Sequence, residues 1–73
     1  MNASTQHHLS KLDRTIVSLL NERARLIASD PTADANPEAH LKDLQRRSSG
    51  PFPAQALRLT FESIQAGCAE QAR

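Results

Sequence analysis

The most regular feature of the chain is an apolar stripe in its first thirty residues. From residue 6 to about residue 29, apolar side chains recur every three or four positions, which is the spacing of one face of an α-helix. The stripe consists of Leu9, Leu12, Ile16, Leu19, Leu20, Leu26 and Ile27. Ser4 or Thr5 can cap its start, and Asp30-Pro31 ends it, because a proline disfavours helical geometry in the residue before it. The pattern predicts a long amphipathic helix of about six turns.

A short second helix is expected after a loop over residues 32–36. Asn36 followed by Pro37 is a start signal, because the asparagine side chain can cap the helix and the proline ring is pre-set for its first turn. The helix then runs from residue 37 to about residue 47, with Ala39, Leu41 and Leu44 on its buried side. The Ser-Ser-Gly run at residues 48–50 ends it.

A third helix is predicted from Pro53 to about Arg73, because proline is tolerated in the first turn of a helix. Its apolar stripe consists of Leu57, Phe61, Ile64 and Cys68. The sequence therefore predicts an all-α fold of three helices, long, short and intermediate, in one domain over residues 1–73.

A chain of 73 residues can build only a thin core, since it buries about 60% of the surface that its unfolded form exposes. Cys68 is the only cysteine, so an intramolecular disulfide is impossible, and the chain offers no set of metal ligands. His7 and His8 are neighbours on a helix and point in different directions, which favours a surface location. Part of the long first helix would remain uncovered in a monomer. We therefore expect a homodimer that packs through this helix.

The charge balance and the N-terminus exclude several classes of function. Nine Lys+Arg and eight Asp+Glu give a formal net charge of +1, which disfavours nucleic-acid binding. No stretch approaches the ~20 apolar residues of a membrane span, and the polar start lacks the features of a secretory signal. We expect a cytoplasmic protein that binds neither nucleic acid nor membrane.

Two segments match the motifs of one enzyme family. Residues 12–24, LDRTIVSLLNERA, place a Leu-Asp pair before an apolar run that closes in Asn-Glu-Arg. Residues 50–64 lead from Gly-Pro-Phe-Pro into the last helix. In order and helix context the two segments resemble the helical (AroQ-type) chorismate mutase family. The resemblance implies an intertwined helical dimer with the first helices of two subunits packed together.

The family reaction is an isomerisation of chorismate to prephenate in aromatic amino-acid biosynthesis, and the resemblance implies that no cofactor is required. One bond breaks while another forms inside a single dianionic substrate. The site must therefore hold the substrate compactly and place cations against both carboxylates and the ether oxygen, where negative charge grows.

The resemblance places one catalytic cation at Arg23, the arginine of the Asn-Glu-Arg segment. The position is unusual on physical grounds too, because a charge beside the apolar stripe is costly if it is unpaired. Two structural alternatives remain open. The side chain could extend to solvent, or it could pair with an acid such as Asp13 of another helix.

Two further cation positions of the family are lost in the first half of the chain. The arginine that reaches the partner subunit's site falls near Gln6, which is neutral. The family's lysine falls on Asp34, beyond the break at Asp30-Pro31. Gln6 is therefore expected to give only a weak substrate contact.

The second half of the chain departs from the family pattern as well. The Arg-Glu pair of the second helix becomes Ala39 and His40. The serine of the last helix becomes Cys68, and the next Gln/Glu position is Ala72, with Gln71 beside it. His40, Cys68 and Gln71 are expected as weak binding positions, although the place of Cys68 on the apolar stripe favours packing in the core as a small hydrophobe.

Two classes of function follow from the residues. The first is a chorismate mutase that is weak alone and depends on a partner, for example another aromatic-pathway enzyme. The second is a non-catalytic dimerisation or regulatory module, or a binder of a small dicarboxylate or other carboxylate held by Arg23. The missing cations favour low activity. A three-helix nucleic-acid binder is disfavoured by the near-neutral charge.

Overall fold

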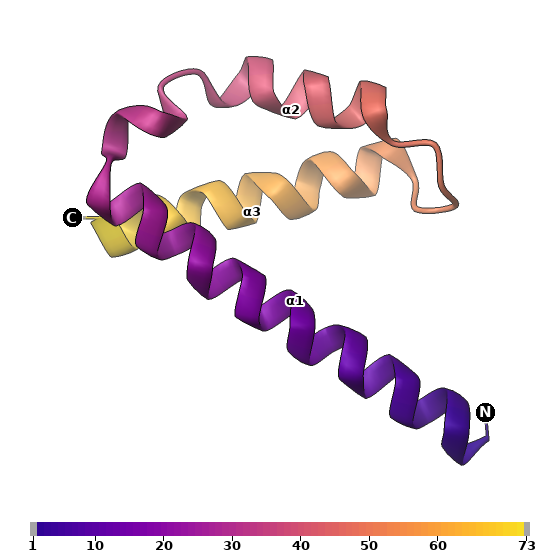
Figure 1. Ribbon diagram of the computed structural model, residues 1–73. Coiled ribbons are helices and arrows are strands. Elements are labelled where there is room, and N and C mark those ends of the chain that lie inside the picture. The colour runs from indigo at the N-terminus through magenta and orange to yellow at the C-terminus, as the bar shows by residue number, and fades with distance from the viewer. Residues whose placement is uncertain (1, 73) are drawn as a thin grey trace.

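The computed structural model describes the backbone of residues 2–72 and the side chains of residues 2–70. Within this range the chain forms three α-helices and one 3-10 helix and has no strand, which confirms the all-α prediction (Figure 1). The elements are α1 (Ala3–Ser29), η1 (Pro31–Asp34), α2 (Pro37–Arg47) and α3 (Ala54–Ala72).

The start of α1 differs from the sequence prediction. Neither Ser4 nor Thr5 is the cap; instead the side chain of Asn2 accepts a hydrogen bond from the backbone N–H of Thr5 at 2.7 Å. Asn2 has extended backbone geometry, which is the conformation that an N-cap residue needs. The helix consequently begins three residues earlier than the apolar stripe indicated. Its end, at Asp30, is as predicted.

The segment expected to be a loop contains the single turn of η1. Pro31 occupies the first position of this turn, where its missing N–H is harmless. The backbone N–H of Ala33 donates to the carbonyl of Asp30 at 3.0 Å, and the Thr32 hydroxyl donates to the Asp30 carboxylate at 2.6 Å. These bonds hold the chain in a compact reversal between α1 and α2.

The bounds of α2 match the prediction, and Asn36 caps it by accepting a hydrogen bond from the N–H of Ala39 at 3.2 Å. The helix α3 begins at Ala54, and the N–H of Leu57 donates to the carbonyl of Pro53. The expected end at Arg73 lies outside the described residues.

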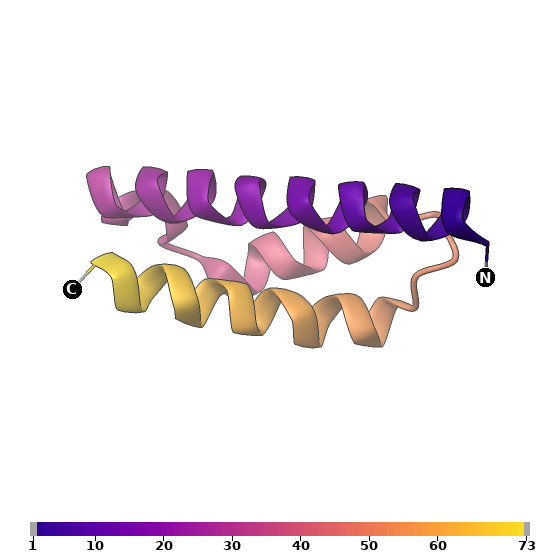
Figure 2. The same cartoon turned by 90° about the horizontal axis from the view of Figure 1, so that it is seen from below.

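The helices form an open V. The helices α1 and α3 meet near their C-terminal ends and diverge toward their N-terminal ends, while α2 runs in the opposite direction beside α3 (Figures 1 and 2). Polar contacts join α2 to α3. The Arg58 guanidinium donates to both carboxylate oxygens of Glu38, at 2.8 and 2.6 Å, and the amide of Gln65 donates to the Pro37 carbonyl.

The core of the single chain is very small. Leu41 and Cys68 are the buried apolar residues of the described part, and α1 has no buried residue. Leu9, Leu12 and Ile16 on the α1 stripe are about half exposed, at 46%, 51% and 52%. The N-terminal part of α1, indigo in Figure 1, extends away from α2 and α3.

The exposed area is larger than a monomer of this mass would have. The chain exposes 5801 Å², whereas a folded protein of 8.0 kDa exposes roughly 4,450 Å² by the usual scaling of surface with mass. The radius of gyration is 14.3 Å, against about 11 Å for a compact domain of this length. The excess, roughly 1,350 Å², is above the ~800 Å² that each partner buries in a standard interface.

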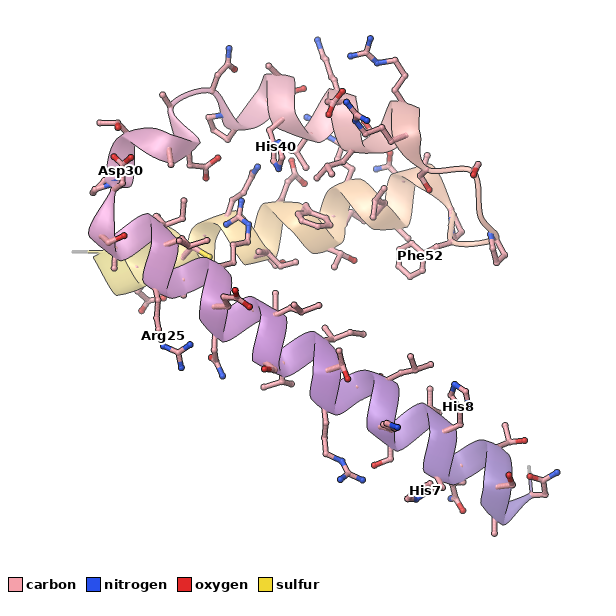
Figure 3. All side chains as sticks on the ribbon, viewed as in Figure 1. His7, His8, Arg25, Asp30, His40 and Phe52 are labelled. Carbon is pink, nitrogen blue, oxygen red and sulfur yellow. The ribbon has the colours of Figure 1, made fainter. Side chains whose placement is uncertain are left out.

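We predict a homodimer with α1 of each subunit at the interface. Sedimentation should give a particle of twice the 8.0 kDa chain mass at micromolar concentration. Ile16→Asp should convert it to a monomer or unfold it, because a carboxylate would enter the apolar interface. Arg25→Asp is the matched control, since Arg25 points away from α2 and α3 (Figure 3) and should leave the dimer intact. A wild-type monomer would contradict the prediction.

We also predict that the contact between α2 and α3 weakens in acid. The hydrogen bond from Arg58 holds the pKa of Glu38 below its ordinary value of 4.5. A carboxyl group whose pKa is lower in the folded than in the unfolded protein stabilises the fold at any pH above its unfolded-state pKa. This stabilisation is lost as the pH falls through the folded-state pKa. Wild type should therefore melt roughly 1–4 °C above Glu38→Gln near neutral pH.

The difference in melting temperature should shrink as the pH falls below 4.5 and should disappear once the pH is below the lowered pKa of Glu38 in the folded protein. Glu62→Gln is the control, because Glu62 meets the same guanidinium only at 3.7 Å and should give a smaller difference. A difference that stays constant from neutral to acid pH would show that Glu38 acts by packing and not by charge.

Candidate functional site

A small cavity of about 200 Å³ lies where α1 ends and α2 begins. The break at Asp30-Pro31 makes the chain reverse, so that η1 returns over the last turns of α1. Three elements consequently contribute side chains to one place. The lining residues are Arg23, Leu26 and Ile27 of α1, Ala33 and Asp34 of η1, Asn36 of the connection, and His40 of α2.

Arg23 is the central residue of this region. Its guanidinium Nη1 donates to the Cys68 thiol at 3.1 Å, and its Nη2 lies 3.9 Å from the Asp34 carboxylate. Its side chain is 22% exposed, as expected for a charge beside an apolar stripe. The acid that meets Arg23 within the chain is thus Asp34 and not Asp13. The ion pair partly offsets the cost of removing the guanidinium from water.

Asp34 is the residue whose importance the sequence did not indicate. Its side chain is 18% exposed, and no described group donates a hydrogen bond to its carboxylate. Its approach to Arg23 is a tertiary contact between residues eleven positions apart across a helix break. The hint in the sequence was that the predicted resemblance to chorismate mutases would place the family's lysine at this position.

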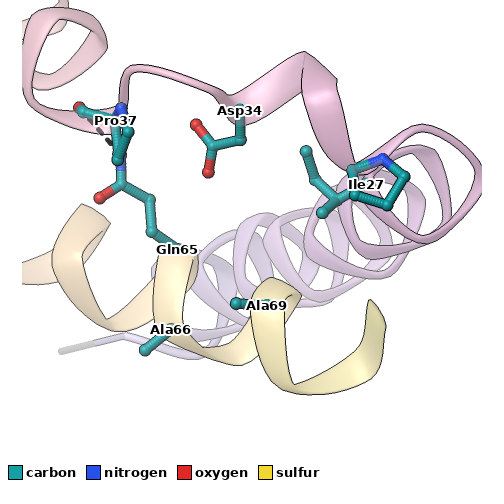
Figure 4. Close-up of a pocket in the computed structure, with 7 residues that line it drawn as sticks. Ile27, Asp34, Pro37, Gln65, Ala66 and Ala69 are labelled. Atoms are coloured by element: carbon teal, nitrogen blue, oxygen red, sulfur yellow. Dashed lines mark hydrogen bonds between the residues drawn. The ribbon is translucent and has the colours of Figure 1, made fainter. Parts of the chain in front are cut away.

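Asp34 also faces a second, larger hollow of about 480 Å³ between η1 and α3 (Figure 4). Ile27 and Asp34 line both spaces, so the two hollows adjoin at these side chains. The rest of the larger hollow is mostly apolar: Pro31, Pro37, Ala66 and Ala69, with the amide of Gln65. Charged groups thus lie at one end and an apolar wall at the other.

The predicted site residues divide into three groups. Arg23, His40 and Cys68 come together, since Arg23 contacts the Cys68 thiol and shares its cavity with His40, which lies on the side of α2 that faces α3 (Figure 3). Gln6 lies about 25 Å along α1 from Arg23, at a rise of about 1.5 Å per residue, so a single chain does not bring it to the site. The side chain of Gln71 lies outside the described residues.

Cys68 has the structural role that its place on the α3 stripe indicated. It is 4% exposed and accepts a hydrogen bond from Arg23. It also lines a hollow of about 430 Å³ between α1 and α3. Cys68 therefore holds α1 and α3 together at the point where the V closes.

The arginines of α2 and the neighbouring Arg58 of α3 are engaged elsewhere. Arg58 pairs with Glu38, and Arg47 pairs with Asp43 at 2.8 Å, which holds the pKa of the Asp43 carboxyl below its usual range. None of these residues lines the cavity at Arg23. The cavity therefore carries one guanidinium and one carboxylate, with no net charge from this pair.

Similarity to known proteins assigns no function to these residues. A comparison with protein-family models, with curated proteins and with solved structures finds no match for this chain. Within the described residues, no three His, Cys, Asp or Glu side chains are grouped as ligands of a metal ion. No helix among them is both long and apolar enough to cross a membrane.

Proposed function

We propose that this chain is a chorismate mutase-like helical homodimer that keeps a site for a small carboxylate at Arg23 and has little mutase activity of its own. One observation carries the proposal. Arg23 is the one Lys or Arg among the residues that line the cavity, and it is paired with a carboxylate, Asp34, at the position where the resemblance would place the family's lysine. A single guanidinium can hold one carboxylate by charge-assisted hydrogen bonds.

The arrangement is poorly suited to the rearrangement of a dianion. The reaction needs cations at both carboxylates and a donor at the ether oxygen, where negative charge grows in the transition state. The Asp34 carboxylate would repel that charge. Each charge-assisted hydrogen bond is worth roughly 1.5–3 kcal/mol, so the absence of several of them removes several powers of ten in rate. A protein partner, such as another aromatic-pathway enzyme, would have to reorganise the site for efficient turnover.

The second candidate function is a dimerisation or regulatory module without a ligand. The uncovered apolar stripe of α1 favours this candidate, because its exposed apolar surface is larger than a binding site for one small molecule requires. The two candidates differ in whether Arg23 binds a ligand.

We predict turnover of chorismate at least about a thousandfold below that of an efficient family member. The estimate assumes ~1.4 kcal/mol lost at each of the positions Gln6, Asp34 and Ala39. Gln6→Arg alone should not restore the rate, because Asp34 would still face the site. The loss of chorismate by the purified protein is the direct measurement. An ordinary enzymatic rate without a partner would overturn the degenerate-site proposal.

We predict that Arg23→Ala abolishes binding of chorismate, measured by chemical-shift titration of the full chain. The helical content should be retained, while the melting temperature should fall, because Asp34 loses its ion-pair partner and Cys68 loses its hydrogen-bond donor. Arg14→Ala is the control, because Arg14 lies on the same helix, donates a hydrogen bond to the Ser10 hydroxyl and does not line the cavity. Chorismate binding that survives in Arg23→Ala would favour the module without a ligand site at Arg23.

A further inference from the structure

The charged end of the site is a matched pair, not a lone cation. The Arg23 Nη2 atom and the Asp34 Oδ2 atom lie 3.9 Å apart, which is too far for a hydrogen bond. Both side chains are only about one-fifth exposed, and the Asp34 carboxylate accepts no hydrogen bond from the described residues. The two groups offset each other's charge but leave donors and acceptors free for a third partner.

This spacing fits a ligand that carries both signs of charge on one carbon atom. In an α-amino acid, standard bond lengths and angles place the ammonium nitrogen about 3 Å from a carboxylate oxygen. Laid against the pair, the ligand carboxylate meets Arg23 and the ligand ammonium meets Asp34, so that the four charges alternate in sign. A ligand with a carboxylate alone would also meet Arg23 but would face repulsion from Asp34.

The walls of the adjoining hollow determine the rest of the ligand. Ile27 and Asp34 are shared by the two spaces, and beyond them lie Pro31, Ala66 and Ala69 (Figure 4). These side chains offer apolar surface and no second charge. With its charged groups at Arg23 and Asp34, a ligand placed beside Asp34 would turn a short apolar side chain toward this hollow.

We infer that the site takes a free α-amino acid with an apolar side chain, held by its carboxylate on Arg23 and by its ammonium group on Asp34. The inference rests on the proposed carboxylate function of Arg23 and adds the role of Asp34. It makes the preferred ligand an apolar α-amino acid, which carries no net charge, ahead of a dianion such as chorismate.

Leucine and two analogues test the inference on the wild-type protein. 4-Methylpentanoate is leucine without its ammonium group, and 3-methylbutylamine is leucine without its carboxylate. Chemical-shift titration of the full-length chain should show leucine binding at least about tenfold more tightly than either analogue, which corresponds to about one lost charged contact. This series needs no variant that might fold differently.

A substitution of Asp34 provides the second test of the inference. Asp34→Asn should weaken leucine binding about tenfold or more, and should leave 4-methylpentanoate binding unchanged or tighter because the repelling carboxylate is gone. Glu70→Gln is the matched control, since Glu70 is exposed on α3 and lines neither hollow. Circular dichroism checks that each variant keeps its helices.

The outcomes separate this inference from the proposed function. If 4-methylpentanoate binds as tightly as leucine, Arg23 is a carboxylate site and the role of Asp34 is wrong. If neither compound binds at its highest soluble concentration, both the inference and the proposed carboxylate function are wrong. Tighter binding of leucine that Asp34→Asn leaves unchanged would also overturn the inference.

Discussion

The missing N–H of Pro31 is the constraint on which the arrangement of this protein depends. A proline has no backbone donor and disfavours helical geometry in the residue before it, so α1 ends at Ser29 although apolar side chains continue to its last turn. The chain then reverses through η1 and starts α2 at the Asn36 cap. The reversal brings Asp34 to Arg23, encloses the small cavity and sets the direction of the helical hairpin that follows. A continuous helix through residue 31 would separate Arg23 from Asp34 by about three turns.

The second physical theme is a shortage of buried apolar surface. Two apolar residues are buried in the described part of the chain, and the α2–α3 hairpin relies on Arg58–Glu38 and on side-chain bonds to backbone carbonyls. Exposed ion pairs contribute little, typically below about 1 kcal/mol each. The apolar stripe of α1 is therefore the largest apolar surface whose burial could still stabilise the chain, and the chain by itself leaves it uncovered. The candidate site lies at the closed end of the V, where α1 and α3 pack against each other, which gives Arg23 its fixed position.

Local signals predicted the helices well, because caps and prolines act on neighbouring residues. The Asn36-Pro37 start and the Asp30-Pro31 stop are where the sequence indicated them. The start of α1 was missed because Asn2 lies outside the apolar stripe and only its side-chain bond to Thr5 makes it the cap. The pairing of Arg23 with Asp34 and Cys68 could not be read from the sequence, because it depends on how three elements pack in space. The resemblance to chorismate mutases stays a prediction, as do the dimer and the location in the cell.

The contact between Arg23 and Cys68 spans 45 residues, and this separation has a consequence for the order in which the protein is made. Synthesis proceeds from the N-terminus at about 5–20 residues per second, so Cys68 is joined to the chain roughly 2–9 seconds after Arg23. A local contact such as the bond from the Thr5 N–H to Asn2 needs only neighbouring residues, whereas the contact that closes α1 against α3 has to wait for the last residues of the chain. The V can therefore close only at the end of synthesis.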